Sequence, residues 1–165
     1  MSLELSDPTL LRQQALIDGQ WRDADADGRC EVRNPASSAL LGSVPDMGVD
    51  ETRRAIDAAC AAQPTWAAKT AKERARVLRR MADLMLEHQQ DLAKLMTAEQ
   101  GKPLAESTGE IAYAASFLEW FGEEAKRMDG DTIPGHAVDK RIHTLRQPVG
   151  VVAAITPWNF PSAML

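Results

Sequence analysis

The chain has 165 residues, which is enough for one domain and short for two. Hydrophobic residues make up 44% and charged residues 26%, proportions that are typical of a folded globular protein and exclude a disordered tail. The net charge is −5 and no basic stripe stands out, which excludes nucleic acid from the expected partners.

Only 2 cysteines are present, Cys30 and Cys60, and no histidine pattern accompanies them to form a zinc site. Such sparse cysteine indicates a reducing compartment. The first residues carry neither a signal-peptide nor a transit-peptide pattern, and no apolar stretch approaches the roughly 20 residues of a bilayer crossing. We therefore expect a cytoplasmic protein that binds neither a membrane nor a metal.

Apolar and polar residues alternate over residues 15–21 and again over residues 31–34, with an acidic, glycine-containing loop between them. This pattern predicts a short antiparallel pair of strands. A helical period begins at residue 49, with Asp50 as its N-cap and Pro64 as its stop. Cys60 falls on the apolar face of that helix, so we expect a small buried side chain rather than a reactive thiol.

A second helix opens at Thr70, where Glu73 three residues later completes a capping box. Residues 91–100 form a third helix that is closed by Gly101. We therefore interpret residues 99–102 as a helix end rather than as a catalytic site. The core stripe expected on the second helix consists of Val77, Leu78, Met81, Leu84 and Met85.

The longest helix is predicted over residues 104–128, with Ile111 and Ala115 in the core. After this helix the residues alternate as a strand over residues 141–146, where His143 is expected to be an ordinary surface side chain. An aromatic stripe on the long helix is also expected to be buried: Tyr113, Phe117, Trp120 and Phe121.

Residues 149–155 are continuous, β-branched and alanine-rich, which predicts a strand buried on both faces of a parallel sheet. Such sheets bind ligands beyond the carboxyl ends of their strands. The next residues form a loop stiffened by two prolines, in which the Asn159 amide brings two N–H donors. A rigid loop could aim these donors at one point, as an oxyanion site requires. The alternative, a braced loop whose aromatic side chains cap the core, fits the spacing equally well.

Residues 156–161 read Thr-Pro-Trp-Asn-Phe-Pro and follow Gln-Pro-Val-Gly-Val at residues 147–151. Together these runs closely resemble the signature of the aldehyde dehydrogenase superfamily. Five further segments resemble the family in the same order, and the last two are most similar to its succinate-semialdehyde dehydrogenase (GabD-like) branch: residues 17–21, 34–36, 99–106, 113–121 and 130–135.

The resemblance implies an α/β fold, namely the helix-rich amino-terminal part of a modified Rossmann domain with one strand of the oligomerisation domain. Residues 1–138 would belong to the NAD(P)-binding domain and residues 139–148 to the oligomerisation strand. Residues 149–165 would form the first buried Rossmann strand and the active-site loop. The parent protein is expected to be a homo-oligomer, either a dimer or a tetramer.

In that family a cysteine thiolate attacks the aldehyde, an asparagine side chain helps to hold the oxyanion, and hydride passes to NAD(P)⁺. The resemblance gives the asparagine role to Asn159, and gives the wall of the substrate tunnel to Phe160 and Met164, joined by Tyr113. The residues it assigns to the nicotinamide half of NAD or NADP are Ile155, Thr156, Pro157, Trp158 and Asn159.

Family members continue for several hundred residues more, and their nucleophilic cysteine and general-base glutamate lie in that later portion. Neither Cys30 nor Cys60 falls at the nucleophile's motif. We therefore expect an amino-terminal fragment, inactive by itself, whose parent oxidises succinate semialdehyde to succinate with NAD(P)⁺. The alternatives are a dehydrogenase of another small aldehyde, such as glutarate semialdehyde or betaine aldehyde, and a noncatalytic scaffold of the same fold. The residues present do not distinguish NAD⁺ from NADP⁺.

Overall fold

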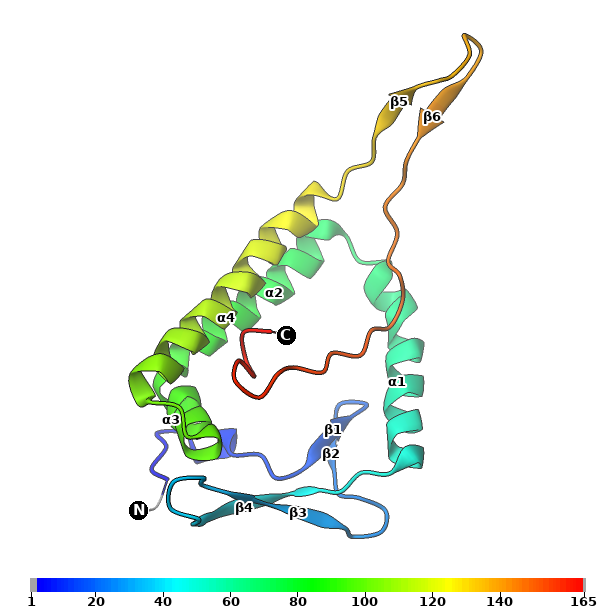
Figure 1. Cartoon of the computed structure of the whole chain (residues 1–165). Coiled ribbons are helices and arrows are strands. Elements are labelled where there is room, and N and C mark those ends of the chain that lie inside the picture. The colour runs from blue at the N-terminus through cyan, green and yellow to red at the C-terminus, as the bar shows by residue number, and fades with distance from the viewer. Residues whose placement is uncertain (1–2, 165) are drawn as a thin grey trace.

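The computed structural model describes residues 3–164. Three helices form one layer, a further helix stands opposite them, two hairpins lie at one end and a third hairpin projects from the other (Figure 1). In chain order the elements are η1 (Pro8–Leu10), β1 (Ala15–Ile17), β2 (Gln20–Arg22), β3 (Arg29–Arg33), β4 (Leu40–Pro45), α1 (Val49–Ala67), α2 (Ala71–Glu87), α3 (Gln89–Gln100), α4 (Leu104–Glu124), η2 (Ala125–Arg127), β5 (Thr132–Pro134) and β6 (Arg141–His143).

The first strands form two separate antiparallel hairpins, β1 with β2 and β3 with β4. The predicted pairing of residues 15–21 with residues 31–34 is therefore wrong. Residues 15–21 contain a two-residue turn, Asp18-Gly19, in which both residues have positive φ, at 52° and 71°. Asp-Gly in that conformation makes the tight turn that hairpins favour, so the segment folds back on itself instead of pairing with residues farther along.

Helix α1 begins after Gly48, so Asp50 lies in its first turn and is not the N-cap. The helix also continues past Pro64, which was predicted to stop it. Pro64 lies in the last turn, where its missing N–H removes one hydrogen bond without breaking a helix interior. Cys60 is exposed, contrary to expectation, because α1 stands apart from the helical layer (Figure 1).

Helix α2 begins with the predicted capping box between Thr70 and Glu73. Its predicted core stripe is wrong in three positions, because Val77, Met81 and Leu84 are exposed. Small residues form the buried face instead, and the backbones of α2 and α4 come close to one another there. A Cβ added at Gly122 of α4 would lie 3.4 Å from the backbone oxygen of Ala75 in α2. The contact therefore depends on alanine and glycine rather than on large side chains.

The hydrophobic core of the described residues lies between α3 and α4, where Ala93, Met96 and Ile111 pack together against Met85 and Leu92. Helix α4 ends close to the predicted boundary and continues as the 3₁₀ turn η2.

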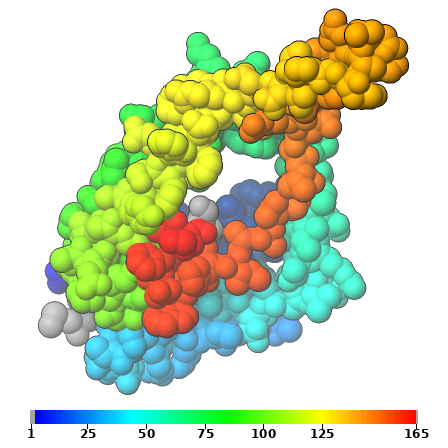
Figure 2. Space-filling model, turned by 45° about the horizontal axis from the view of Figure 1, so that its top comes forward, coloured from blue at the N-terminus to red at the C-terminus, as the bar shows by residue number. Residues whose placement is uncertain are grey.

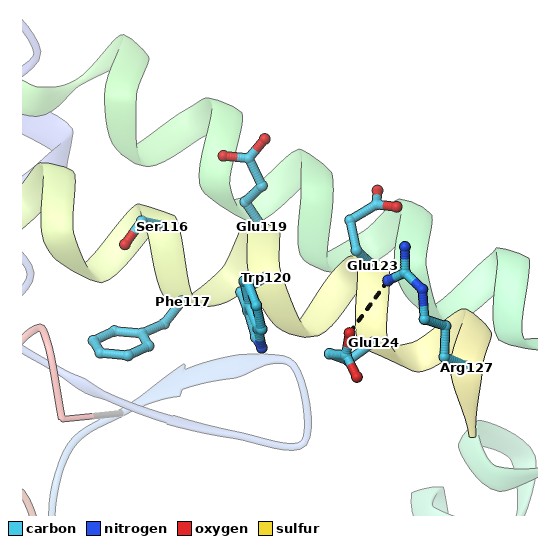
Figure 3. A pocket seen from close by; sticks show the side chains of 7 residues that line it. All are labelled: Ser116, Phe117, Glu119, Trp120, Glu123, Glu124 and Arg127. Atoms are coloured by element: carbon cyan, nitrogen blue, oxygen red, sulfur yellow. Dashed lines mark hydrogen bonds and ion pairs between the residues drawn. The ribbon is translucent and has the colours of Figure 1, made fainter. Parts of the chain in front are cut away.

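The predicted burial of the α4 aromatic stripe is wrong: Tyr113, Trp120 and Phe121 are exposed, and Phe117 is only partly buried. Figure 3 shows Phe117 and Trp120 projecting from the side of α4 that is turned away from α2. That side of α4 has no element of residues 3–164 packed over these rings, and so the stripe is left uncovered.

Strands β5 and β6 form the projecting hairpin, with Thr132 opposite His143. The predicted strand over residues 141–146 is thus confirmed only in its first three residues, and His143 is exposed as expected. The predicted buried strand over residues 149–155 is wrong for this chain. Val149 is 91% exposed and Ile155 is 96% exposed. Within residues 3–164 no parallel strand lies beside this segment, so its backbone has no ladder to join.

None of the helices in the described part of the chain is long and apolar enough to cross a membrane.

Candidate active-site loop

The segment predicted to carry the chemistry, residues 156–164, is a series of turns that lies beside α3 and α4 (Figure 1). In Figure 2 the C-terminal residues, coloured red, sit against α4, whereas the orange stretch before them borders an open gap. The Phe160 N–H donates to the Pro157 carbonyl oxygen at 3.4 Å, and Ala163 is buried. The loop is thus packed onto the helices, although the residues leading to it are not.

Lys102 holds the middle of this loop from the end of α3. Gly101 ends that helix with a φ of 83°, and an added Cβ there would lie 2.9 Å from Pro35 Cγ. The Lys102 ammonium then donates to the Asn159 carbonyl oxygen at 2.6 Å, and it lies 4.4 Å from the centre of the Phe160 ring. The second distance is that of a cation–π contact. Lys102 thereby fixes the backbone of Asn159 and the ring that follows it.

Glu110 holds the far side of the loop from α4, and its side chain is only 1% exposed. One carboxylate oxygen accepts from Lys102 Nζ at 2.5 Å. The other accepts from the backbone N–H of Ser162 at 2.9 Å and of Ala163 at 3.4 Å. The buried carboxylate therefore has both a counter-ion and hydrogen-bond donors, the arrangement that a buried charge needs.

Gln100 makes a third link, because its Nε2 donates to the Trp158 carbonyl oxygen at 3.3 Å. Its Oε1 is buried and has no hydrogen-bond partner among residues 3–164. Glu99 faces the same recess, and burial raises the pKa of its carboxyl above the ordinary value. The recess lies under the loop and is lined by Pro35, Leu92, Leu95, Met96, Glu99, Gln100, Ile111, Trp158, Pro161 and Ser162.

The side chain of Asn159 is exposed, and its amide makes no hydrogen bond with any of residues 3–164. Its two N–H donors therefore have no partner among residues 3–164, and they belong to a residue whose backbone Lys102 holds. Trp158 is 81% exposed, whereas Phe160 and Met164 are about half exposed on the same loop. The structure thus brings together most of the residues to which the resemblance gives roles. Tyr113 lies on α4 instead, with its ring centre 4.6 Å from that of Phe117.

Lys102 and Glu110 were missed as site residues. The helix-end interpretation of residues 99–102 is confirmed for Gly101, yet it is incomplete, because Lys102 reaches the loop. A signal for Glu110 was present in the sequence: it lies at helical spacing among Ser107, Ile111 and Ala114, all of which are buried. A carboxylate within a buried stripe indicates a partner with the opposite charge or with N–H donors.

Other parts of the described chain offer less chemistry. Among residues 3–164 no three histidine, cysteine or carboxylate side chains are arranged to hold a metal ion. Cys30 and Cys60 are exposed, and neither belongs to the loop. The recess on α4 in Figure 3 presents two aromatic rings beside carboxylates, one of which, Glu124, forms an ion pair with Arg127 at 3.2 Å. These paired charges fit a helix surface rather than a reaction centre.

Comparison with known proteins gives one consistent answer. The sequence pattern of the aldehyde dehydrogenase family matches residues 21–165. A glutarate-semialdehyde dehydrogenase of Pseudomonas aeruginosa is 67% identical over 163 residues, and the NADP⁺-linked succinate-semialdehyde dehydrogenase GabD of Escherichia coli is 64% identical over the same length. In each case the match covers 99% of this chain and 34% of the relative.

Solved structures agree with the sequence matches. An NADP-dependent enzyme of E. coli superposes with a TM-score of 0.95 at 64% identity, over 98% of this chain and 34% of that one. A succinate-semialdehyde dehydrogenase of Burkholderia pseudomallei gives a TM-score of 0.94 at 59% identity, over 97% and 33%. The chain spans about a third of the length of these relatives, and the predicted α/β class is confirmed. The chain belongs to the aldehyde dehydrogenase family.

Proposed function

We propose that the full-length protein is an NAD(P)-dependent aldehyde dehydrogenase that oxidises succinate semialdehyde to succinate, and that residues 156–164 form part of its active site. The observation that carries this proposal is the exposed Asn159 side chain, whose amide has no partner among residues 3–164 while Lys102 holds the backbone of the same residue. The names of the relatives support the substrate class, because two of them are semialdehyde dehydrogenases that match nearly the whole of this chain.

The chemical role of Asn159 follows from what its amide can donate. Attack on an aldehyde turns the carbonyl oxygen into an oxyanion, and a donor already aimed at that position stabilises the transition state. Loss of one such donor typically costs about 2.7–4 kcal/mol of activation free energy. The hydrogen bond from Lys102 to the Asn159 carbonyl keeps the backbone in place without using the side-chain amide, so both N–H donors stay available.

The residues before Asn159 fit the nicotinamide half of NAD or NADP, which accepts hydride from the substrate carbon when it is bound. Ile155 and Trp158 present exposed apolar surface, as the flat face of such a ring requires. The Trp158 carbonyl already accepts from Gln100, so the loop stays ordered without the cofactor. We assign Ile155, Thr156, Pro157, Trp158 and Asn159 to cofactor contact.

The residues after Asn159 suit the substrate side. Phe160 is 40% exposed and Met164 is 47% exposed on the loop that carries the proposed oxyanion site, and we assign both to the tunnel wall. Tyr113 is assigned to the same wall from its exposed position on α4, one helical turn beyond Glu110. No metal takes part in this arrangement.

In the full-length protein we propose three segments: residues 1–138 in the NAD(P)-binding domain, residues 139–148 in the oligomerisation domain, and residues 149–165 in the first buried Rossmann strand and active-site loop. Strand β6 of the projecting hairpin lies in the second segment and supports that assignment, because an exposed strand edge can pair with another chain (Figure 1). We propose a homo-oligomer, a dimer or a tetramer, located in the cytoplasm. Both cysteines of residues 3–164, Cys30 and Cys60, are exposed free thiols, which suits a reducing compartment.

Glutarate semialdehyde is the rival substrate, because one relative at 67% identity bears that name. The test is the kcat/KM of the full-length enzyme for succinate semialdehyde, glutarate semialdehyde and betaine aldehyde, each with NAD⁺ and with NADP⁺. We expect the highest value for succinate semialdehyde. A higher value for glutarate semialdehyde would reassign the substrate, and no turnover of any aldehyde would favour a noncatalytic scaffold.

A further inference from the structure

We propose that Lys102 and Glu110 are positioning residues of the active site, which hold Asn159 by its backbone so that its side-chain amide stays aimed at the reacting oxygen. This inference rests on the proposed function of Asn159. Neither residue is expected to touch the substrate, since both act through the loop. Lys102 comes from the short linker between α3 and α4, and Glu110 comes from α4 itself, so two separate points of the helical layer hold the loop.

The contacts of Lys102 and Glu110 hold the backbone on both sides of the Asn159 side chain. Lys102 Nζ donates to the carbonyl oxygen of Asn159 itself, at 2.6 Å, and covers the neighbouring Phe160 ring at 4.4 Å. On the other side of Pro161, the N–H groups of Ser162 and Ala163 both donate to Glu110. The backbone is thus held at its carbonyl side and at its amide side, over five consecutive residues. The Asn159 side chain can then move only by rotation about its own side-chain torsion angles.

The pair works as a unit because each charge would be unfavourable alone. The Lys102 side chain is 10% exposed and that of Glu110 is 1% exposed, so each depends on the other for a counter-ion. Removal of the ammonium would leave a buried carboxylate with only backbone donors, and the loop could then shift to admit water. A displacement of about 1 Å at a reacting group can reduce a rate by about 100-fold.

A purely structural role for the pair would predict a different result. An ion pair that only stabilises the fold changes the melting temperature and leaves kcat of the folded enzyme near normal. A positioning pair reduces kcat in enzyme that is still folded, and its effect disappears when Asn159 is already missing. Effects of residues that act through one group are non-additive in this way.

The experiment is a double-mutant cycle in the full-length enzyme with NAD(P)⁺ and succinate semialdehyde. The variants are Lys102→Met, Asn159→Ala and the two combined, with kcat, KM, cofactor Kd and melting temperature measured for each. Lys126→Met is the matched control, because Lys126 also pairs with a glutamate on this helical layer, at 3.0 Å, but is exposed and makes no hydrogen bond or ion pair with residues 156–164. Glu110→Gln is the second test variant, since it keeps the acceptor for the Ser162 N–H and removes the charge.

We expect Lys102→Met to lower kcat about 10- to 100-fold with little change in cofactor Kd. The combined variant should fall within about threefold of Asn159→Ala alone, and Lys126→Met should match the unsubstituted enzyme. Glu110→Gln should lower kcat less than Lys102→Met, and its effect should also vanish in the Asn159→Ala background. If Lys102→Met does not fold, Glu110→Gln and its own cycle decide the question.

Two results would overturn the inference. One is normal kcat in Lys102→Met or Glu110→Gln with only a lower melting temperature, which would make the pair structural. The other is a combined variant whose loss equals the product of the single losses, which would mean that Lys102 acts independently of Asn159. If instead Asn159→Ala itself keeps normal kcat, the proposed function of Asn159 is wrong, and the inference about Lys102 and Glu110 is wrong as well. The single Asn159→Ala variant therefore distinguishes this failure from a failure of the inference alone.

Discussion

Two adjacent segments near the carboxyl end behave in opposite ways. Residues 149–155 are apolar and β-branched, yet they are exposed and unpaired in the described chain. Residues 156–164 contain prolines and polar groups, yet a buried ion pair holds them against two helices. The comparison shows that order follows from available partners rather than from hydrophobicity. A strand needs neighbouring strands, whereas this loop finds its partners in residues 100–110 of the same chain.

The comparison sets a limit on what the ordered loop can do alone. Residues 156–164 carry the proposed oxyanion donor, whereas the two cysteines lie on β3 and α1, and neither lines the recess under the loop. We therefore expect the 165-residue chain to form no NAD(P)H from succinate semialdehyde, a complete loss relative to the full-length enzyme. NAD(P)H formation by this chain, abolished by Asn159→Ala, would contradict that expectation.

Hydrogen exchange would measure the difference between the two segments directly. In the 165-residue chain the amides of residues 149–155 should exchange nearly as fast as in an unfolded peptide. Amides within α4 should be slower by a factor on the order of 100 or more, because their hydrogen bonds open only with the packed helical layer. In the full-length enzyme the amides of residues 149–155 should become protected. Strong protection of this segment in the 165-residue chain would show that it finds a partner here after all.

The ion pair that holds the loop should matter far more to stability than a pair on the surface. Glu110→Ala in the full-length enzyme leaves the Lys102 ammonium buried and unpaired, and should destabilise the fold by about 3–5 kcal/mol. Glu123→Ala removes an exposed partner of Lys126 and should change the free energy of unfolding by about 0–1 kcal/mol. Denaturant unfolding of both variants would test this, and equal effects would contradict the importance given to burial.

Features that depend on near neighbours could be predicted from the sequence. The capping box of Thr70 and Glu73 needs only residues three apart, and the helix stop at Gly101 needs only a left-handed residue. The same reasoning should have identified the Asp18-Gly19 turn, because that dipeptide is a strong hairpin signal. The predicted pairing of residues 15–21 with residues 31–34 is wrong because this turn closes residues 15–22 into their own hairpin.

Features that depend on distant partners could not be predicted. Helical periodicity shows that one face of α2 is apolar, but it does not show whether another element covers that face. The burial predicted for Val77 is wrong because Val77 is exposed. Asn159 was found through its motif, whereas the lysine that holds its carbonyl lies 57 residues earlier in the chain. Only the fold brings Lys102 and Asn159 together.

The smallest expected effect is on the pH dependence of stability, in which two carboxyl groups of α3, those of Asp91 and Glu99, should act in opposite directions. Backbone N–H groups of Ser6 and Asp7 lower the pKa of Asp91, so its ionised form stabilises the fold above about pH 4. That contribution is lost as the pH falls through the lowered pKa. Burial raises the pKa of Glu99, so its ionisation opposes folding, and this cost grows as the pH rises from the ordinary pKa of a glutamate to the raised one. Ionisation of Asp91 therefore raises the free energy of unfolding, whereas ionisation of Glu99 lowers it.

Melting temperatures of two variants between about pH 2 and about pH 8 would separate these effects, because the Asp91 contribution is lost below about pH 4. Asp91→Asn should melt lower than the unsubstituted protein at pH 7, with the difference shrinking toward low pH. Glu99→Gln should melt slightly higher at pH 7 and show no gain near pH 4. The same pH response in both variants would contradict the environments described for the two carboxyls.

The central claim is that Asn159 donates to the oxyanion, and its most direct test is Asn159→Ala in the full-length enzyme. Single-turnover NAD(P)H formation would be measured together with the cofactor Kd, so that chemistry is separated from binding. We predict a fall in rate on the order of 10²–10³-fold with little change in Kd, and a larger fall for Asn159→Asp, which places a negative charge beside the oxyanion. A near-normal rate with a cofactor Kd raised about tenfold or more would show instead that Asn159 positions the cofactor.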